Sequence, residues 1–297
     1  MVKSNSMFSK SADAAILAAL TLIAFLSLFP LVHTVALSFS EKAAANAGEV
    51  ILWPKGINVT SYKIILEDQK FFTAFGVSVK RVLLGAFINF ALTVVMAYPL
   101  SKGSRVFPGR NLYMWYLVFC MLFSGGLIPL YMTVTELNLQ NTLWSLVLPG
   151  AVPIFNVILI MNFFRNLPKE LEEAAIVDGA GPWQTLIRIF LPVSLPALAT
   201  VTLFSIVGHW NSFFDGLIFM SKPENYPLQT YIQQLVVRID PELLKNLTAE
   251  ELIRLNKASD RTLNAAKLVV AMVPLLAIYP FLQKYFVHGI VLGSVKE

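Results

Sequence analysis

The residues with the most chemical potential lie close together in the stretch GHWNSFFDGLIFM, near the end of an apolar run. Trp210 offers a flat face on which a sugar ring can stack, and Asn211 beside it offers hydrogen bonds. His209 and Asp215 add titratable groups, and Asn156 is a similar polar residue in the preceding apolar run. Polar groups in membrane-spanning segments are costly and tend to face an interior pathway. These five residues are therefore candidate contacts of a polar solute; hydrogen bonding between helices is the alternative.

The chain carries no recognisable constellation for catalysis. It has no G-x-x-x-x-G-K-[ST] phosphate loop, and its three histidines, His33, His209 and His288, are far apart in the sequence. The single cysteine, Cys120, lies in an apolar run and cannot form an internal bridge. A net charge of +5 is too small and dispersed for nucleic acid. We therefore expect no enzyme, no metal and no cofactor bound by this chain, and no nucleic-acid partner.

The composition places these residues in a bilayer. Of 297 residues, 56% are hydrophobic and 14% charged, whereas soluble domains carry about 25% charged residues. The mean hydropathy of +0.66 argues against a soluble enzyme and against disorder. The apolar runs do not alternate, which favours helices over the strands of a barrel. The sequence predicts an all-α integral membrane protein.

Six apolar runs are long enough, or nearly so, to cross a bilayer core of roughly 30 Å as helices. The predicted spans are residues 14–37, 75–100, 111–133, 142–164, 193–220 and 267–288. Lys284 interrupts the last run, but a lysine near a helix end can extend to the interface. The first run could also be a signal peptide with a small-residue site at 45–47. Its 24 apolar residues exceed the usual 7–15, so an uncleaved helix is favoured.

Charge in the short loops predicts the orientation. The loop 101–110 carries Lys102, Arg105 and Arg110 with no acidic residue, so it is expected in the cytoplasm. Six spans then place both termini there as well. The expected cytoplasmic segments are 1–13, 101–110, 165–192 and 289–297, and the expected outer loops are 38–74 and 221–266.

The loop after the fourth span contains proline and glycine residues at positions typical of helix ends. Its sequence is RNLPKELEEAAIVDGAGPWQTLIRIFLP. Pro168 suits the first turn of a helix, and acidic residues follow it. Gly179 stands where a C-terminal cap is expected, and Pro182 restarts a helix. Ala174 and Ala175 let another surface approach closely. The pattern predicts two short helices that offer a handle to a cytoplasmic partner, or else an ordinary structured loop.

The motif Glu173-Ala174-Ala175, three residues, Gly179, nine residues, then Ile189-Phe190-Leu191-Pro192 resembles the EAA loop of ABC importer membrane subunits. Every fixed position of that pattern is filled. The stretches SGGLIPLYM, NTLWSLVLPGA and GHWNSFFDGLIFM look like the carbohydrate-importer branch. The likeness covers most of the chain from about residue 70 onward. It is closest to permeases for oligosaccharides and polysaccharide fragments, including alginate-type importers.

The resemblance implies a six-helix type I ABC importer permease with one transmembrane domain over about residues 70–285. Its EAA loop would form coupling helices that insert into a cleft on a cytoplasmic ATPase. The residues carried over for docking are Glu173, Ala174, Ala175, Asp178 and Gly179. Those carried over as anchors to the fifth span are Ile189, Leu191 and Pro192. ATP and Mg²⁺ would be bound by the partner ATPase and not by this chain.

The implied partners are a homologous permease forming a heterodimer, two ATPase copies and an extracytoplasmic solute-binding protein that contacts loop 221–266. The implied substrate is a carbohydrate, and the implied location is the bacterial cytoplasmic (inner) membrane. The alternative is a secondary transporter or channel for a polar solute. That alternative needs a charged residue near a span centre, and spans one to four lack one. Lys80, Arg81 and Lys267 are expected near an outer vestibule, and the particular sugar stays open.

Overall fold

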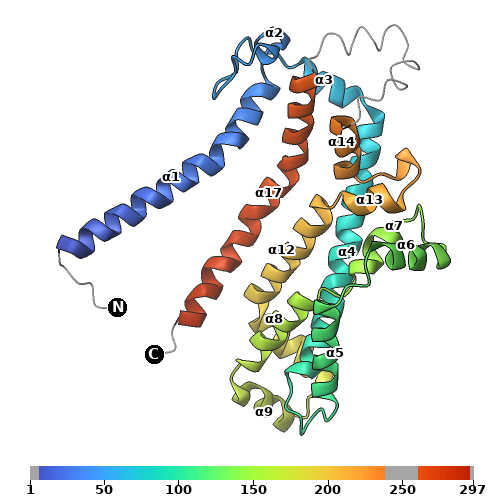
Figure 1. Ribbon diagram of the computed structural model, residues 1–297. Coiled ribbons are helices and arrows are strands. Elements are labelled where there is room, and N and C mark those ends of the chain that lie inside the picture. Colours follow the sequence, from blue (N-terminus) through green and yellow to red (C-terminus); the bar gives the residue numbers. More distant parts are fainter. Residues whose placement is uncertain (1–6, 238–259, 295–297) are drawn as a thin grey trace. The chain divides into compact units, whose positions relative to one another are not determined.

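The computed structural model describes residues 7–237 and 260–294, and every regular element in those ranges is helical (Figure 1). The chain divides into two compact units. One combines described parts of 1–69 and 234–273, and the other combines described parts of 70–233 and 274–297. The first contains α1 (Met7–Ser38), α2 (Lys42–Asn46), α3 (Thr60–Glu67) and the start of α17 (Asp260–Ser294). The all-helical fold class is confirmed.

The second unit holds the remaining elements. In chain order they are α4 (Gln69–Ser101), α5 (Arg110–Leu122), α6 (Leu127–Glu136), α7 (Leu143–Val147), η1 (Leu148–Gly150), α8 (Ile154–Arg165), α9 (Lys169–Val177), α10 (Pro182–Thr185), η2 (Leu186–Phe190), α11 (Leu191–Val193), α12 (Leu195–Asn211), α13 (Phe214–Phe219), η3 (Pro223–Asn225) and α14 (Leu228–Val237). The element η2 is a single π-helical turn.

Among the described residues, three single helices are long and apolar enough to cross a membrane. Three further pairs of helices, each bent at a short break, are long and apolar enough if each pair is taken as one span. The single helices are the stretches 10–38, 69–101 and 261–278. All three helices extend beyond the expected spans, because a helix continues past a charged residue until a breaker stops it. Hence α1 begins at Met7 instead of residue 14, α4 begins at Gln69 instead of residue 75, and α17 runs from Asp260 to Ser294 instead of 267–288. Residues 238–259 of the expected outer loop 221–266 lie outside the described residues.

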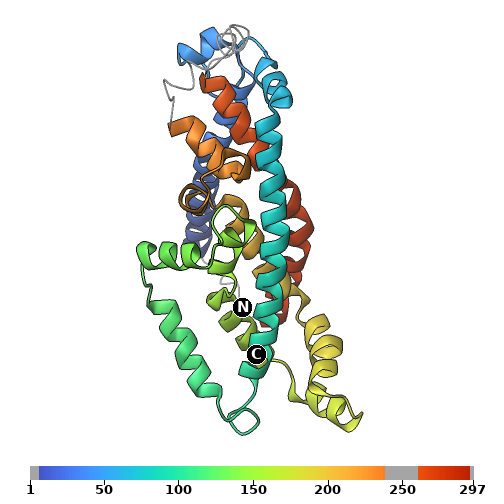
Figure 2. The same cartoon turned by 90° about the vertical axis from the view of Figure 1, so that its right-hand side faces the viewer.

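The expected third span, 111–133, is not one straight helix. Its two halves, α5 and α6, meet at 110° (Figure 2). The break contains Gly126, whose φ of +90° suits glycine and interrupts a right-handed helix. The fourth run bends by 47° before α8, where Pro153 cannot donate a backbone hydrogen bond. The fifth run begins after an 85° bend at Ser194 and breaks again between α12 and α13.

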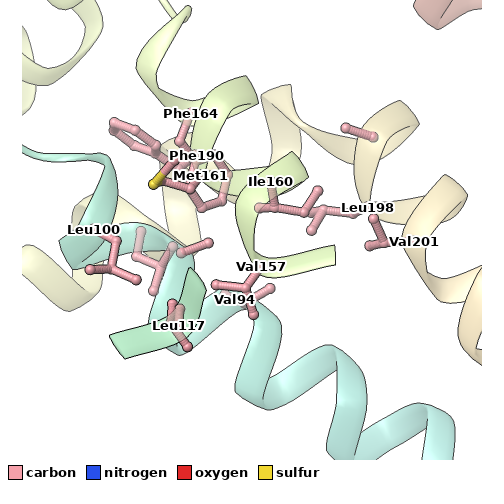
Figure 3. Close-up of a cluster of buried hydrophobic side chains, with 13 residues drawn as sticks. Val94, Leu100, Leu117, Val157, Ile160, Met161, Phe164, Phe190, Leu198 and Val201 are labelled. Carbon is pink, nitrogen blue, oxygen red and sulfur yellow. The ribbon is translucent and has the colours of Figure 1, made fainter. Parts of the chain in front are cut away.

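The core of the second unit joins α4, α5, α8, η2 and α12. Val157 and Ile160 of α8 lie fully buried at its centre (Figure 3). Phe190 packs edge-on against Tyr98 and Phe164, with ring centroids 5.1 and 5.3 Å apart. Close packing of this kind fixes the relative positions of the helices that carry the polar residues.

Candidate functional site

A polar cavity of about 410 Å³ lies inside the second unit, among α4, α7, α8, α12 and α13. Three of the five solute-contact residues predicted from sequence, Asn156, His209 and Asp215, line it. The other polar side chains on its wall are Arg81, Asn89, Ser145, Ser205 and Ser212. Hydrogen-bonding groups converge here within an apolar helical bundle, which makes this cavity the candidate solute site.

Arg81 of α4 and Asp215 of α13 form a two-pronged ion pair at one wall of the cavity. The Arg81 side chain is 2% exposed and also donates to the backbone oxygens of Ser212 and Leu146, at 3.2 and 3.4 Å. Asp215 is 24% exposed and accepts bonds from the Ser212 hydroxyl at 2.8 Å and the Gly216 N–H at 2.9 Å. One guanidinium therefore joins α4, α7 and the break between α12 and α13.

Asn89 and His209 form the next layer of the cavity wall. Nδ2 of Asn89 donates to the Gly150 carbonyl at 3.0 Å, and its Oδ1 lies 3.0 Å from His209 Nε2. The His209 ring reaches this position because the facing residue on α4 is Gly85. A Cβ built on Gly85 would lie 2.6 Å from both Cδ2 and Cε1 of His209. The absence of a side chain at Gly85 thus makes room for the imidazole.

Gly85→Ala is therefore expected to destabilise the protein by about 1–3 kcal/mol, since overpacking a tight helix contact has costs of this size. The added methyl group would push the ring off Asn89. Thermal unfolding in lipid nanodiscs measures the change. The double variant with His209→Ala serves as the control, because it frees the space and should recover most of the loss. A single variant as stable as the parent would contradict the close contact.

Asn156 of α8 lines the same cavity. Its Nδ2 donates to the Val201 carbonyl at 3.3 Å and approaches the Ser205 hydroxyl at 3.4 Å. These bonds cross to α12, so the residue also serves the interhelical role that the sequence left as an alternative.

Trp210 and Asn211, the other two predicted contacts, do not line the cavity. Trp210 is 5% exposed, and its ring packs edge-on against Phe75 with centroids 5.6 Å apart. Asn211 ends α12 and is exposed. The sequence showed the residue types but not the rotation of α12, which turns His209 to the cavity and Trp210 to the packed side.

Arg81 is a residue of the cavity wall that was not among the solute contacts predicted from sequence. It was expected near an outer vestibule, and it lies within α4 as the partner of Asp215. The available signal was Asp215 in another apolar run, because a charge in a membrane helix needs a partner. Lys80 is exposed and Lys267 is buried. Among the described residues, no cluster of three or more His, Cys, Asp or Glu side chains could hold a metal ion.

The loop with the EAA pattern folds as the two short helices predicted. Gly179, with φ +76°, follows α9 and closes it with two backbone bonds. These bonds run from Gly179 N to Ile176 O at 3.0 Å and from Ala180 N to Ala175 O at 2.9 Å, as in a Schellman motif. The helix α10 then begins at Pro182.

The predicted docking and anchoring residues separate by exposure. Glu173, Ala174, Asp178 and Gly179 are exposed, whereas Ala175 is 4% exposed and packs inward. Ile189 and Leu191 pack against the core cluster, and Pro192 is exposed. Five large apolar side chains on this loop are also exposed, and the sequence did not indicate them. Leu171 is 36% exposed, and Ile176, Val177, Trp183 and Ile187 are 58–86% exposed.

Residues 83–291 match the family model described as "binding-protein-dependent transport system inner membrane component". The chain belongs to this family. It is therefore a transport permease and a membrane protein, as the resemblance indicated. The matched region contains most of the polar cavity and the whole EAA loop.

Relatives of this permease cover nearly its full length. Protein LplC of Bacillus subtilis is 38% identical over 91% of this chain and 90% of its own. The polygalacturonan/rhamnogalacturonan transport system permease protein YtcP, also of Bacillus subtilis, is 34% identical over 93% of this chain and 95% of its own. A chain of a bacterial ABC transporter involved in the import of the acidic polysaccharide alginate superimposes with a TM-score of 0.86. That chain is 29% identical, and the match covers 96% of this permease and 100% of that chain. The importer-permease fold is confirmed.

Proposed function

We propose that this permease forms half of the pathway by which an ABC importer moves an oligosaccharide or related carbohydrate across a bacterial cytoplasmic membrane. The observation that carries the proposal is the cavity of about 410 Å³, whose amide, imidazole and hydroxyl groups can exchange hydrogen bonds with sugar hydroxyls. The relatives that handle polygalacturonan, rhamnogalacturonan and alginate support a polysaccharide fragment as the substrate.

The contacts proposed for this solute are Asn156, His209 and Asp215, together with Arg81 and Asn89. Because Arg81 and Asp215 neutralise each other, the wall offers hydrogen bonds without a net charge from that pair. A sugar passing through would meet polar atoms on several helices at once.

The energy would come from a separate ATPase that docks on the EAA loop and holds the ATP and Mg²⁺. The exposed apolar side chains of this loop support the docking role, since an exposed apolar cluster marks an interaction surface. Glu173, Ala174, Asp178 and Gly179 are exposed beside it. The loop would face the cytoplasm, with both termini on the same side, and Lys102, Arg105 and Arg110 support that orientation.

The complete importer would contain this chain, a homologous permease, two ATPase copies and an extracytoplasmic solute-binding protein. The family description, which names dependence on a binding protein, supports the last partner. This chain itself would carry out no chemical step, and its role would be to alternate access to the cavity.

The test is uptake of labelled oligosaccharides into proteoliposomes that contain the full complex. We expect uptake only with ATP inside, all subunits present and the binding protein outside. Fragments of polygalacturonan, rhamnogalacturonan and alginate should be compared with a neutral oligosaccharide of equal length. Uptake without an ATPase chain, driven by an ion gradient, would contradict the proposal and identify a secondary transporter.

A further inference from the structure

Lys102 follows the last residue of α4 and contacts side chains from three helical elements. Its Nζ lies 2.7 Å from Oε1 of Glu172 on α9. The same atom stands 4.2 Å from the ring centroid of Tyr98 and 4.3 Å from that of Phe190. One ammonium group therefore contacts a carboxylate and two aromatic faces, and these partners come from α4, α9 and η2.

Burial distinguishes this contact from an ordinary surface ion pair. The Lys102 side chain is 11% exposed and that of Glu172 34%, whereas Lys55 and Glu49 form an ion pair in which both side chains are 56% exposed. Exposed pairs contribute little because water screens them and the side chains lose freedom. A cation between aromatic faces is bound more strongly as it leaves water. The position of Lys102 is therefore well defined.

The elements joined at Lys102 have different proposed tasks. The helix α9 belongs to the loop proposed to dock the ATPase. The helix α4 runs without interruption from Gln69 to Ser101 (Figure 2) and carries Arg81 and Asn89 on the wall of the cavity. The EAA loop is also connected to the cavity along the chain, through η2 and α11 into α12. That connection contains an 85° bend at Ser194. The connection through Lys102 thus reaches the cavity along one continuous helix.

We propose that Lys102 is a positioning residue that fixes the coupling helix α9 to α4, so that displacement of α9 by the ATPase moves the cavity wall. This inference rests on the proposed docking of an ATPase to the EAA loop. Glu172 holds α9 to the ammonium group, while Tyr98 and Phe190 hold the ammonium group against α4 and η2. Movement of α9 is transmitted to Arg81 and Asn89 as a rigid displacement of α4.

The test uses the complete complex in proteoliposomes and measures sugar imported per ATP hydrolysed. Lys102→Met keeps a long apolar side chain but removes the charge, and Lys102→Arg keeps both the charge and its attraction to aromatic rings. We expect Lys102→Met to retain the ATPase subunits and lower the transport ratio at least fivefold. Lys102→Arg should restore at least half of the ratio. Lys55→Met, which breaks the exposed ion pair, is the matched control and should leave the ratio unchanged.

An unchanged ratio in Lys102→Met would overturn the role of Lys102, even if uptake and hydrolysis both decreased, because a purely structural loss lowers them together. If Lys102→Met does not assemble, Glu172→Gln leaves the aromatic contacts in place and must lower the same ratio at least twofold. No change in Glu172→Gln would then overturn the proposal. Failure of the docking proposal is recognised separately, since the unmodified complex would then transport without the ATPase.

Discussion

Asp215→Asn is expected to destabilise the protein by about 3–5 kcal/mol, the cost of leaving a buried charge without its partner. The charge that remains is the guanidinium of Arg81, which is 2% exposed. Two carbonyl oxygens, of Ser212 and Leu146, cannot replace the carboxylate charge. The change is measured as a lower midpoint of thermal unfolding in nanodiscs and as loss of uptake by the assembled complex.

Removing the other partner should cost less, about 1–3 kcal/mol. In Arg81→Met the carboxylate of Asp215 is still 24% exposed and keeps the Ser212 hydroxyl and the Gly216 N–H. The double variant Arg81→Met with Asp215→Asn leaves no net charge and should be more stable than Asp215→Asn alone. Equal losses in the two single variants, with no recovery in the double variant, would contradict the ion pair.

Val177→Asp is expected to weaken association with the ATPase more than 100-fold while the permease folds normally. Val177 is 86% exposed in the loop proposed for docking, so a carboxylate there meets water in the free permease. In the complex it would be buried without a partner, which costs several kcal/mol. A loss of about 2.8 kcal/mol already corresponds to 100-fold in affinity. Co-purification of the ATPase and its affinity in nanodiscs measure the effect.

Ile57→Asp is the matched control for this experiment. Ile57 is 79% exposed in the expected outer loop 38–74, far in sequence from the EAA loop, and its replacement should leave ATPase binding within about twofold. Normal binding by Val177→Asp would remove this residue from the docking surface. Equal loss in both variants would indicate a nonspecific charge effect.

Local signals in the sequence predicted much of this fold. Apolar runs of the length that a bilayer requires predicted helices, and helices are found in each of these runs. The helices of the EAA loop followed from Pro168, Gly179 and Pro182, since proline and glycine act on the backbone directly.

The bends and the ion pair could not be found in this way. Hydropathy averaged over a run reports its composition and not the direction of the helix axis. The 110° turn between α5 and α6 therefore could not be predicted from the apolar run 111–133. Arg81 and Asp215 are 134 residues apart, and only the assembled fold brings them together. Trp210 was assigned a stacking role from its type, but its contact with Phe75 depends on how α4 and α12 face each other.

The helices α1 and α4 differ in whether they can insert into the bilayer before the rest of the chain has been synthesised. The most apolar stretch of α1 is 0% buried, so this helix can enter the bilayer as a finished element as soon as it is made. In contrast, α4 enters with Arg81, whose carboxylate partner is still 134 residues from being translated. An unpaired arginine makes insertion of a helix unfavourable. The helix α4 therefore depends on the translocation machinery until Asp215 emerges.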